Sequence, residues 1–241
     1  MRLEDHIILE TPDFVVVNKP SGMLTLPDRH DNELASLIAI MKKAYGEIFT
    51  VHRLDRDTSG IILFARNEAA HKYFSQLFES RDVKKFYLGI VNGQLQEKKG
   101  SVAEGIMEHP VQKGKMVTNR KGKASLTDYE VLEEFGLYSL VKMQIHTGRT
   151  HQIRVHMKHL GHPIAVDELY GSAEPVRLSS IKKKFKLGKH TEEERPLLNR
   201  LALHAFMLQF RDPNGKEYTI EAPLPKDMSA LLNQLRKTIH K

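Results

Sequence analysis

Residues 49–65 read FTVHRLDRDTSGIILFA, and this stretch decides the fold. Its two ends, 49–54 and 61–65, are rich in β-branched and aromatic residues, which favours two strands. The loop between them places two carboxylates and two guanidinium groups within five residues, 53–57. A charged loop held by two strands is a common position for reacting groups. The alternative is a solvated turn whose charges pair loosely, each pair contributing about 0–1 kcal/mol.

The sequence on either side of this stretch predicts more strands and a few helices. Apolar runs bounded by turn residues predict strands at 7–9, 14–17, 86–91, 126–132, 137–145, 201–210 and 217–220, and hairpins with basic tips within 94–125. Helical spacing of Leu34, Leu37, Ile38 and Met41 predicts a helix capped by Asn32. Further helices are predicted after a cap at Asn67, over 150–160 and after Asp227. Because strands follow strands without regular βαβ alternation, we predict an α+β fold with a mixed, largely antiparallel central sheet and flanking helices.

The domain organisation is expected to be simple. The 241 residues contain no internal repeat and no linker that clearly divides two domains, so we predict a single domain over 1–241. Residues 172–199 differ in composition, because a run of lysines at 182–184, 186 and 189 precedes three glutamates at 192–194. We predict a basic surface insertion there.

Composition restricts the compartment and the partners. The net charge of +7 and the pI near 9.4 favour a polyanionic partner, although a basic charge can also serve only solubility. The absence of cysteine excludes disulfides, thiolate metal sites and a cysteine nucleophile. The first ten residues resemble no signal peptide, and no apolar stretch approaches the roughly 18 residues of a spanning helix. We therefore expect a cytoplasmic protein with no membrane association.

Two further segments carry side chains suited to binding an anion or a base. In residues 146–156, Arg149 and Arg154 stand at a predicted strand-to-helix junction, where they can bind phosphate or pair with a loop carboxylate. In residues 84–87, Tyr87 follows two lysines and either stacks on a base or simply packs. The five histidines between 146 and 162 lack the H-E-x-x-H pattern, so we expect no metal site.

Taken together, these segments resemble the RluA family of pseudouridine synthases. The run HRLDRDTSG at 52–60 matches the family signature H-R-L-D-x-x-T-S-G at every defined position. Four more runs are similar to family motifs and follow in the family's order: NKPSGMLT at 18–25, KFYLGIVNG at 85–93, HTGRTHQIRVHMKHLGHPI at 146–164 and RLALHA at 200–205. The resemblance covers about residues 7–225, and five motifs in order are highly specific.

The resemblance implies an isomerase that detaches a uracil from its ribose and reattaches it through carbon. The substrate would be ribosomal or transfer RNA, and no metal or organic cofactor is implied. Asp55 would be the catalytic aspartate, Arg154 its ion-pair partner, and Tyr87 the ring that stacks on the uracil and handles the proton at C5. Arg53 would assist in displacing the flipped nucleotide, while His52, Arg149 and Lys85 would contact the RNA.

These implied roles agree with general physical chemistry. Burial raises the pKa of a carboxyl group and a close guanidinium lowers it, so an aspartate that must stay ionised in a cleft needs an arginine. A base inside a helix must be extruded before it can react, and stacking on Tyr87, worth about 1–3 kcal/mol, offsets part of that cost. Attack of Asp55 on the base, attack on the sugar and assisted elimination all remain open.

One departure and two alternatives complete the interpretation. Many relatives carry an N-terminal S4 RNA-binding domain, but the first motif here begins at residue 18, so we expect no such domain, and we expect a monomer. One alternative is an aspartate-nucleophile phosphatase, in which Asp55 and Asp57 would form the D-x-D motif of a magnesium-dependent α/β fold. The other is a non-catalytic RNA-binding module on the same scaffold, in which Asp55 would be dispensable.

Overall fold

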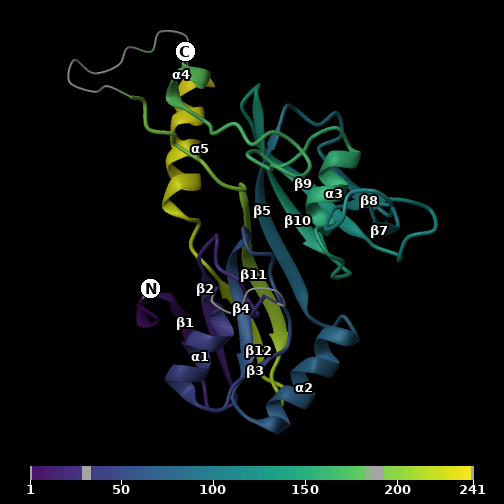
Figure 1. The fold of residues 1–241 in the computed structure, drawn as a ribbon, viewed down its shortest axis with the longest axis vertical. Coiled ribbons are helices and arrows are strands. Elements are labelled where there is room, and N and C mark those ends of the chain that lie inside the picture. Colours follow the sequence, from purple (N-terminus) through teal and green to yellow (C-terminus); the bar gives the residue numbers. More distant parts are fainter. Residues whose placement is uncertain (1, 29–33, 183–184, 186–192, 240–241) are drawn as a thin grey trace. The chain divides into compact units, whose positions relative to one another are not determined.

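The computed structural model describes residues 2–28, 34–182, 185 and 193–239. The chain divides into two compact units, which are drawn in Figure 1. Unit 1 comprises residues 1–87 and 204–223, and unit 2 comprises residues 88–203 and 224–241. Within the described ranges, no helix combines the length and the apolar character that crossing a bilayer requires.

Unit 1 is built on strands from both ends of the chain. Its elements are a short 3-10 helix (Glu4–His6), β1 (Ile7–Glu10), β2 (Phe14–Lys19), α1 (Leu37–Tyr45), β3 (Phe49–Thr50), β4 (Ser59–Ala65), α2 (Glu68–Glu79), β11 (Leu203–Arg211) and β12 (Glu217–Glu221). The strand order is β1-β2-β4-β11, with β3 beside β4 and β12 beside β11. β4 runs antiparallel to β2 and parallel to β11, and it therefore lies in the interior of the sheet.

The core of unit 1 lies on both faces of this sheet. The four residues 14–17 of β2 are at most 1% exposed, because alternate side chains point to opposite faces and both faces are covered. Phe14 and Val16 pack on one face with Phe74 of α2, while the next residues, Val15 and Val17, pack with α1 on the other. The two helices that cover the strands can be followed in Figure 1.

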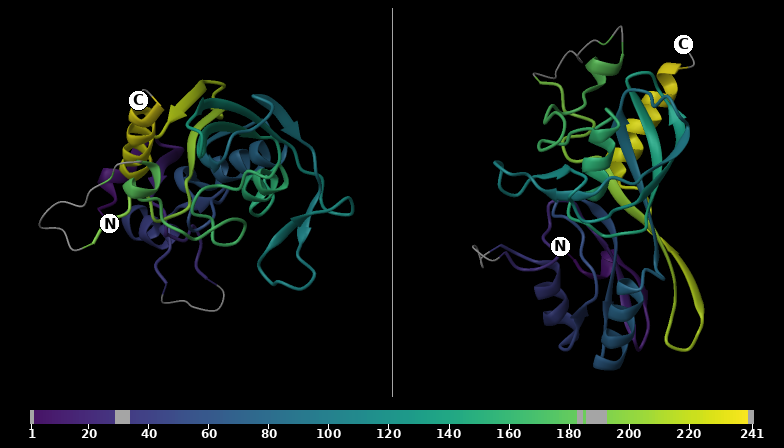
Figure 2. Two further views of the ribbon diagram at one scale, coloured as in Figure 1. Left: turned by 90° about the horizontal axis from the view of Figure 1, so that it is seen from above. Right: turned by 90° about the vertical axis from the view of Figure 1, so that its right-hand side faces the viewer.

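Unit 2 carries the remaining strands. β5 (Lys84–Asn92) begins in unit 1 and continues here, followed by β6 (Lys99–Val102), β7 (Ile106–Glu108), β8 (Met116–Thr118), β9 (Thr127–Glu134), β10 (Tyr138–Ile145), α3 (Gln152–His159), α4 (Leu178–Ile181) and α5 (Lys226–Ile239). The strand order is β5-β10-β9-β6, and β9 is antiparallel to both of its neighbours. β7 and β8 form a separate hairpin next to α3, which Figure 2 shows from two further sides.

The predicted fold class is confirmed, since the strands pair largely antiparallel and helices flank them. The cap at Asn67 is also correct, because its side-chain oxygen accepts the N–H of Ala70 at 2.8 Å. The first helix was predicted to contain Leu34, but α1 begins at Leu37 and Leu34 is 48% exposed, so it adds nothing to the buried face. Its predicted cap, Asn32, lies outside the described residues.

The predicted strand over 49–54 was too long. β3 covers only Phe49–Thr50, because the chain then turns into the charged loop. The ring of His52 stacks on Phe78 of α2, with centroids 4.4 Å apart, and its Nε2 accepts the backbone N–H of Leu63 at 2.9 Å. These contacts hold residue 52 in place of strand pairing.

The described parts of the predicted insertion at 172–199 close on themselves. A bridge between Val176 and Leu198 joins the two ends, and both side chains are at most 2% exposed. The backbone N–H of Ser179 donates to Glu194 across the loop at 2.8 Å. Most of the lysine run that marked this segment, 183–184 and 186–192, lies outside the described residues.

Candidate active site

The loop that carries Asp55 ends in a close approach between two strands. The N–H of Thr58 donates to the carbonyl of Asp55 at 3.2 Å, and β4 starts at the next residue. Gly60 has φ of 115°, and a Cβ atom there would lie 2.1 Å from the carbonyl oxygen of Ala205 in β11. Only glycine fits this position. Ser59 Oγ and His204 Nδ1, 3.0 Å apart and both buried, make a further hydrogen bond between the two strands.

The segment Lys19–Thr25, which we call the loop clamp, holds the same loop from the other side. Lys19 is fully buried, and its ammonium group donates to the carbonyls of Pro20, Met23 and Arg56 at 2.8–3.1 Å. The N–H of Gly22 also donates to the carbonyl of Arg56, at 2.9 Å. The residue that follows Asp55 is thus fixed by two donors.

Two hydroxyl groups of the loop clamp complete this support. Thr25 Oγ1 donates to the carbonyl of Leu54 at 2.9 Å and accepts its N–H at 3.2 Å. Ser21 Oγ donates to the carbonyl of Asp57 at 2.6 Å. The clamp therefore binds the backbone at the residues before and after Asp55, and these bonds leave the Asp55 side chain out of the support.

Asp55 lies close enough to Tyr87 for its charge to affect the pKa of the phenol. Asp55 is half-buried, whereas Tyr87, in β5, is 8% exposed. Burial raises the pKa of the Tyr87 phenol well above its ordinary value, and the nearby Asp55 carboxylate raises it further. Tyr87 is consequently a neutral phenol at physiological pH, next to a carboxylate.

The other predicted site residues of unit 1 differ in exposure. Arg53 is exposed, while Lys85 is 8% exposed and its ammonium lies 5.9 Å from the centre of the Phe78 ring. Burial lowers the pKa of His52 to about 3, and the charge of Lys85 lowers it further, so the ring is neutral. This agrees with Nε2 of His52 accepting a backbone N–H. These contacts show His52 holding the loop, and its contact with RNA stays a prediction.

Arg154, on α3 in unit 2, forms a two-pronged ion pair with Asp167. Nε of Arg154 donates to Oδ2 at 2.8 Å and Nη2 donates to Oδ1 at 2.7 Å, and the two side chains are 5% and 0% exposed. The Tyr170 ring covers the guanidinium, whose central carbon lies 5.0 Å from the ring centre. Arg149, before the helix, is half-buried and donates from Nε to the carbonyl of Ala124 at 3.1 Å.

Each histidine of the 146–162 segment has its own protein partner. The partners, in order for His146, His151, His156, His159 and His162, are Asp128, Tyr170, Thr127, Thr118 and the carbonyl of Asn92. Across the described part of the chain, no group of three or more His, Cys, Asp or Glu side chains is arranged to hold a metal ion.

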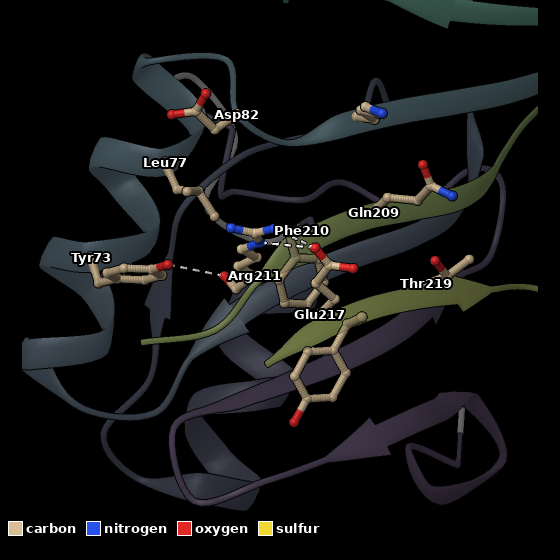
Figure 3. A pocket seen from close by; sticks show the side chains of 10 residues that line it. Tyr73, Leu77, Asp82, Gln209, Phe210, Arg211, Glu217 and Thr219 are labelled. Carbon is tan, nitrogen blue, oxygen red and sulfur yellow. Dashed lines mark hydrogen bonds and ion pairs between the residues drawn. The ribbon is translucent and has the colours of Figure 1, made fainter. Parts of the chain in front are cut away.

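A groove of about 570 Å³ lies elsewhere in unit 1, and Figure 3 shows its lining. Tyr73 of α2 lies on one side and Phe210 and Arg211 of β11 line it with Glu217 of β12. Arg211 and Glu217 form a solvent-exposed ion pair, with side chains that are 67% and 72% exposed. None of the seven predicted site residues lines this groove, so it is distinct from the Asp55 loop.

Residues 13–159 match the family model described as RNA pseudouridylate synthase. The chain belongs to this family. As a pseudouridine synthase it is an isomerase that acts on RNA. It is 34% identical to the uncharacterized RNA pseudouridine synthase YlyB of Bacillus subtilis, over 96% of this chain and 73% of the relative. It is also 34% identical to ribosomal large subunit pseudouridine synthase D of Nitrosomonas europaea (97% and 66%) and synthase C of Escherichia coli (97% and 71%).

Solved structures of related proteins agree with this assignment. The pseudouridine synthase is similar to human RNA pseudouridylate synthase domain containing 4, with a TM-score of 0.74, 25% identity and coverage of 97% and 94% of the two chains. For human RNA pseudouridylate synthase domain containing 1 the TM-score is 0.68 at 28% identity. The phosphatase alternative is wrong, because the largely antiparallel sheet lacks the alternating βα order that such enzymes need.

Three residues that contact predicted site residues or their loop had no role in the sequence interpretation: Lys19, which binds the Asp55 loop in unit 1, and Asp167 and Tyr170, which bind Arg154 in unit 2. Lys19 directly follows the apolar run 14–17 and Asn18, and a lysine at the end of such a strand needs partners for its charge, which is a signal in the sequence. Asp167 and Tyr170 stand in AVDELYG, just after the last matched residue of the long motif, with no periodic pattern around them. Their contact with Arg154 depends on folding and had no local signal.

Proposed function

We propose that this pseudouridine synthase isomerises a uridine of ribosomal or transfer RNA with Asp55 as the catalytic carboxylate. The supporting observation is the Asp55 loop, whose backbone is bound on both sides by the loop clamp, while the carboxylate is near enough to raise the pKa of the buried Tyr87 phenol. The names of the relatives in Nitrosomonas europaea and Escherichia coli favour large-subunit ribosomal RNA. We further propose that residues 1–241 act as one catalytic domain, with 172–199 as a basic insertion.

The proposed reaction balances without a cofactor. The N1–C1′ bond breaks, the uracil rotates, and a bond forms between C5 and C1′. The proton on C5 is lost to a base and ultimately to water, and N1 takes up a proton, so the product is an isomer of the substrate. In these steps a carboxylate can attack the uracil, attack the sugar or act as a base that assists elimination, and the three routes remain open.

Tyr87 is proposed to stack on the extruded uracil. Because its phenol is neutral and buried, the ring offers an apolar face and a hydroxyl hydrogen-bond donor next to Asp55. The proposed transfer of the C5 proton requires the hydroxyl to share its proton with a neighbouring acceptor, since the raised pKa opposes a free phenolate. Stacking is thus the better supported of its two proposed roles.

The remaining residues surround this pair in the proposal. Arg154 is the proposed ion-pair partner of Asp55, and the exposed Arg53 is the proposed residue that fills the place of the flipped nucleotide. Arg149, Lys85 and His52 are proposed to support RNA binding through charge and packing. We propose a cytoplasmic monomer that needs no metal.

Tritium release tests the proposed reaction directly. RNA from cells that lack the protein, labelled with tritium at C5 of uridine, is incubated with the enzyme, and large-subunit ribosomal RNA and transfer RNA are assayed separately. We expect tritium in water from one RNA class, and at least about a 10³-fold loss in the Asp55→Asn variant, as for other essential catalytic groups.

Asp57→Asn is the matched control, because it makes the same change two residues away. Asp57 pairs with Arg56 at 3.0 Å on the exposed side of the loop, so we expect less than about a threefold change in rate. A full rate in Asp55→Asn would refute the catalytic role, and tight RNA binding without release from any RNA would support the non-catalytic binding module.

A further inference from the structure

We infer that Asp167 and Tyr170 are positioning residues that hold the Arg154 guanidinium in one orientation for the reaction. This inference builds on the proposed pairing of Arg154 with the catalytic carboxylate. The carboxylate of Asp167 and the ring of Tyr170 bind the same guanidinium, one at its edge and one over its face. A planar group bound at an edge and a face can no longer rotate.

The edge contact determines which part of Arg154 is committed. Asp167 engages Nε and Nη2, the side of the fork nearest the aliphatic stem, and Nη1 takes no part in this pair. The Asp167 carboxylate is itself fixed, because Oδ1 also accepts the N–H groups of Leu169 and Tyr170 at 3.0 and 3.1 Å. In the proposed pair with Asp55, the Asp55 carboxylate would therefore approach the Nη1 side of a guanidinium that cannot rotate.

The face contact is fixed as firmly. The hydroxyl of Tyr170 accepts the N–H of Met116 in β8 at 2.8 Å and lies 2.8 Å from Nδ1 of His151, the residue before α3. The ring is 4% exposed and packs with Ile106 and Val155. The hydroxyl anchors the tyrosine at its outer end, so its ring stays over Arg154.

The backbone between these residues supports a positioning role. Val166, immediately before Asp167, has φ of 56°, a left-handed conformation that is unfavourable for a β-branched side chain. Such conformations persist where the surrounding contacts require them, and they gather at functional sites. Here the turn at Val166 delivers Asp167 to Arg154. A buried ion pair is in itself weak evidence for stability, which favours a role in orientation.

A double-mutant cycle on turnover tests the inference, using the tritium assay on the RNA that the wild type modifies. We expect Asp167→Asn to lower kcat about 100-fold, as for a displaced catalytic group, and to change KM for RNA less than about threefold. The double variant Asp167→Asn with Arg154→Lys should be no slower than Arg154→Lys alone, because Asp167 acts through Arg154. Additive losses in kcat would overturn the inference.

Asp227→Asn is the matched control in the same unit. Asp227 binds Arg200 through two bonds of 2.6 Å, so the variant loses a bidentate pair of the same kind, and we expect kcat to stay within about twofold. An equal drop in kcat for both variants would mean that any broken ion pair slows the enzyme, which contradicts a specific role for Asp167.

Tyr170→Leu is a second variant that keeps the Arg154–Asp167 ion pair, so it tests the inference even if Asp167→Asn fails to fold. We expect kcat to fall about tenfold, since the face contact is lost while the edge contact remains. Unchanged kcat would refute the role of Tyr170. Absence of tritium release by the wild type, or full activity of Asp55→Asn, would instead reject the proposed function, so the two failures are separable.

Discussion

The Asp55 loop and the Arg154 site hold opposite charges in different ways. At Asp55 the backbone is fixed, because groups of the loop clamp bind the carbonyls of Leu54, Arg56 and Asp57. At Arg154 the side chain itself is fixed, by a carboxylate at its edge and a ring over its face. Asp55 is half-buried, while the Arg154 side chain is 5% exposed.

This difference matches what each group has to do in the proposed reaction. A carboxylate that reacts must change its bonding, so support through the backbone, as the loop clamp provides it, suits Asp55. A guanidinium that only balances charge works best when it does not move, because a preorganised charge needs no rearrangement during the reaction. The variants below test whether the two regions really differ in this way.

The largest effect on stability and turnover is expected from Arg154→Ala, which removes the guanidinium that Asp167 and Tyr170 hold. The Asp167 carboxylate would be left buried and uncompensated, so we expect a loss of about 3–5 kcal/mol in the free energy of unfolding. Turnover should fall by about 10²–10³-fold, more than RNA affinity falls, because a preorganised charge acts mainly in the transition state.

For Arg154→Ala, chemical denaturation measures the free energy of unfolding, single-turnover kinetics measure turnover, and a binding assay measures RNA affinity. Arg149→Ala is the companion variant from the same segment, with a half-buried side chain that binds a backbone carbonyl. It should weaken RNA binding and leave turnover nearly intact. Equal losses of turnover and affinity in Arg154→Ala would contradict its role as an ion-pair partner.

An intermediate effect is expected from Lys19→Met, which loosens the backbone support without touching Asp55. Three carbonyls lose a charged donor, and among the described residues only that of Arg56 keeps a second donor, the N–H of Gly22. Because an acceptor left without a partner costs about 1–3 kcal/mol, we expect a loss of about 3 kcal/mol in stability. Turnover should fall about 10–100-fold because the loop drifts from its productive position. Wild-type turnover in a folded, destabilised variant would show that the clamp serves stability alone.

The smallest effect is expected in the pH dependence of stability for His52→Gln. The folded-state pKa of His52 is about 3 and its ordinary value is 6.5, so below pH 6.5 the unfolded chain binds the proton first. Stability from His52 is therefore complete above pH 6.5 and is lost as the pH falls toward 3, by about 2 kcal/mol at pH 5. His52→Gln should show a drop in unfolding free energy between pH 7.5 and 5.0 that is smaller by this amount. An unchanged drop would mean that His52 is protonated in the folded loop.

Local patterns were enough to predict much of the fold. The apolar runs at 14–17 and 61–65 became β2 and β4, and the cap at Asn67 was correct because capping depends on neighbours in sequence. Family membership followed from five motifs in the family's order, and it is confirmed, while the reactive role of the charged loop stays a prediction. The strand and cap predictions each used residues within about ten positions of one another, and each family motif is likewise a short run.

Long-range contacts were beyond these patterns. The place of β11 beside β4 depends on pairing between residues 203–211 and a segment more than a hundred residues earlier, which no local period reveals. The contact of Asp167 with Arg154 depends on a turn at Val166, whose left-handed backbone conformation cannot be predicted from the sequence. The first helix was misplaced because Leu34 fits the helical spacing and yet remains exposed.

The late arrival of β11 has a consequence for how the protein is made. Until residues 203–211 leave the ribosome, Ser59 and Gly60 lack their neighbouring strand, and the edge of β4 stays open next to the Asp55 loop. An open edge of an apolar strand is a site for misassociation of nascent chains. The Asp55 loop therefore lacks one neighbouring strand until residues 203–211 are made, and the yield of the protein in the cell should depend on chaperones that shield this edge during synthesis.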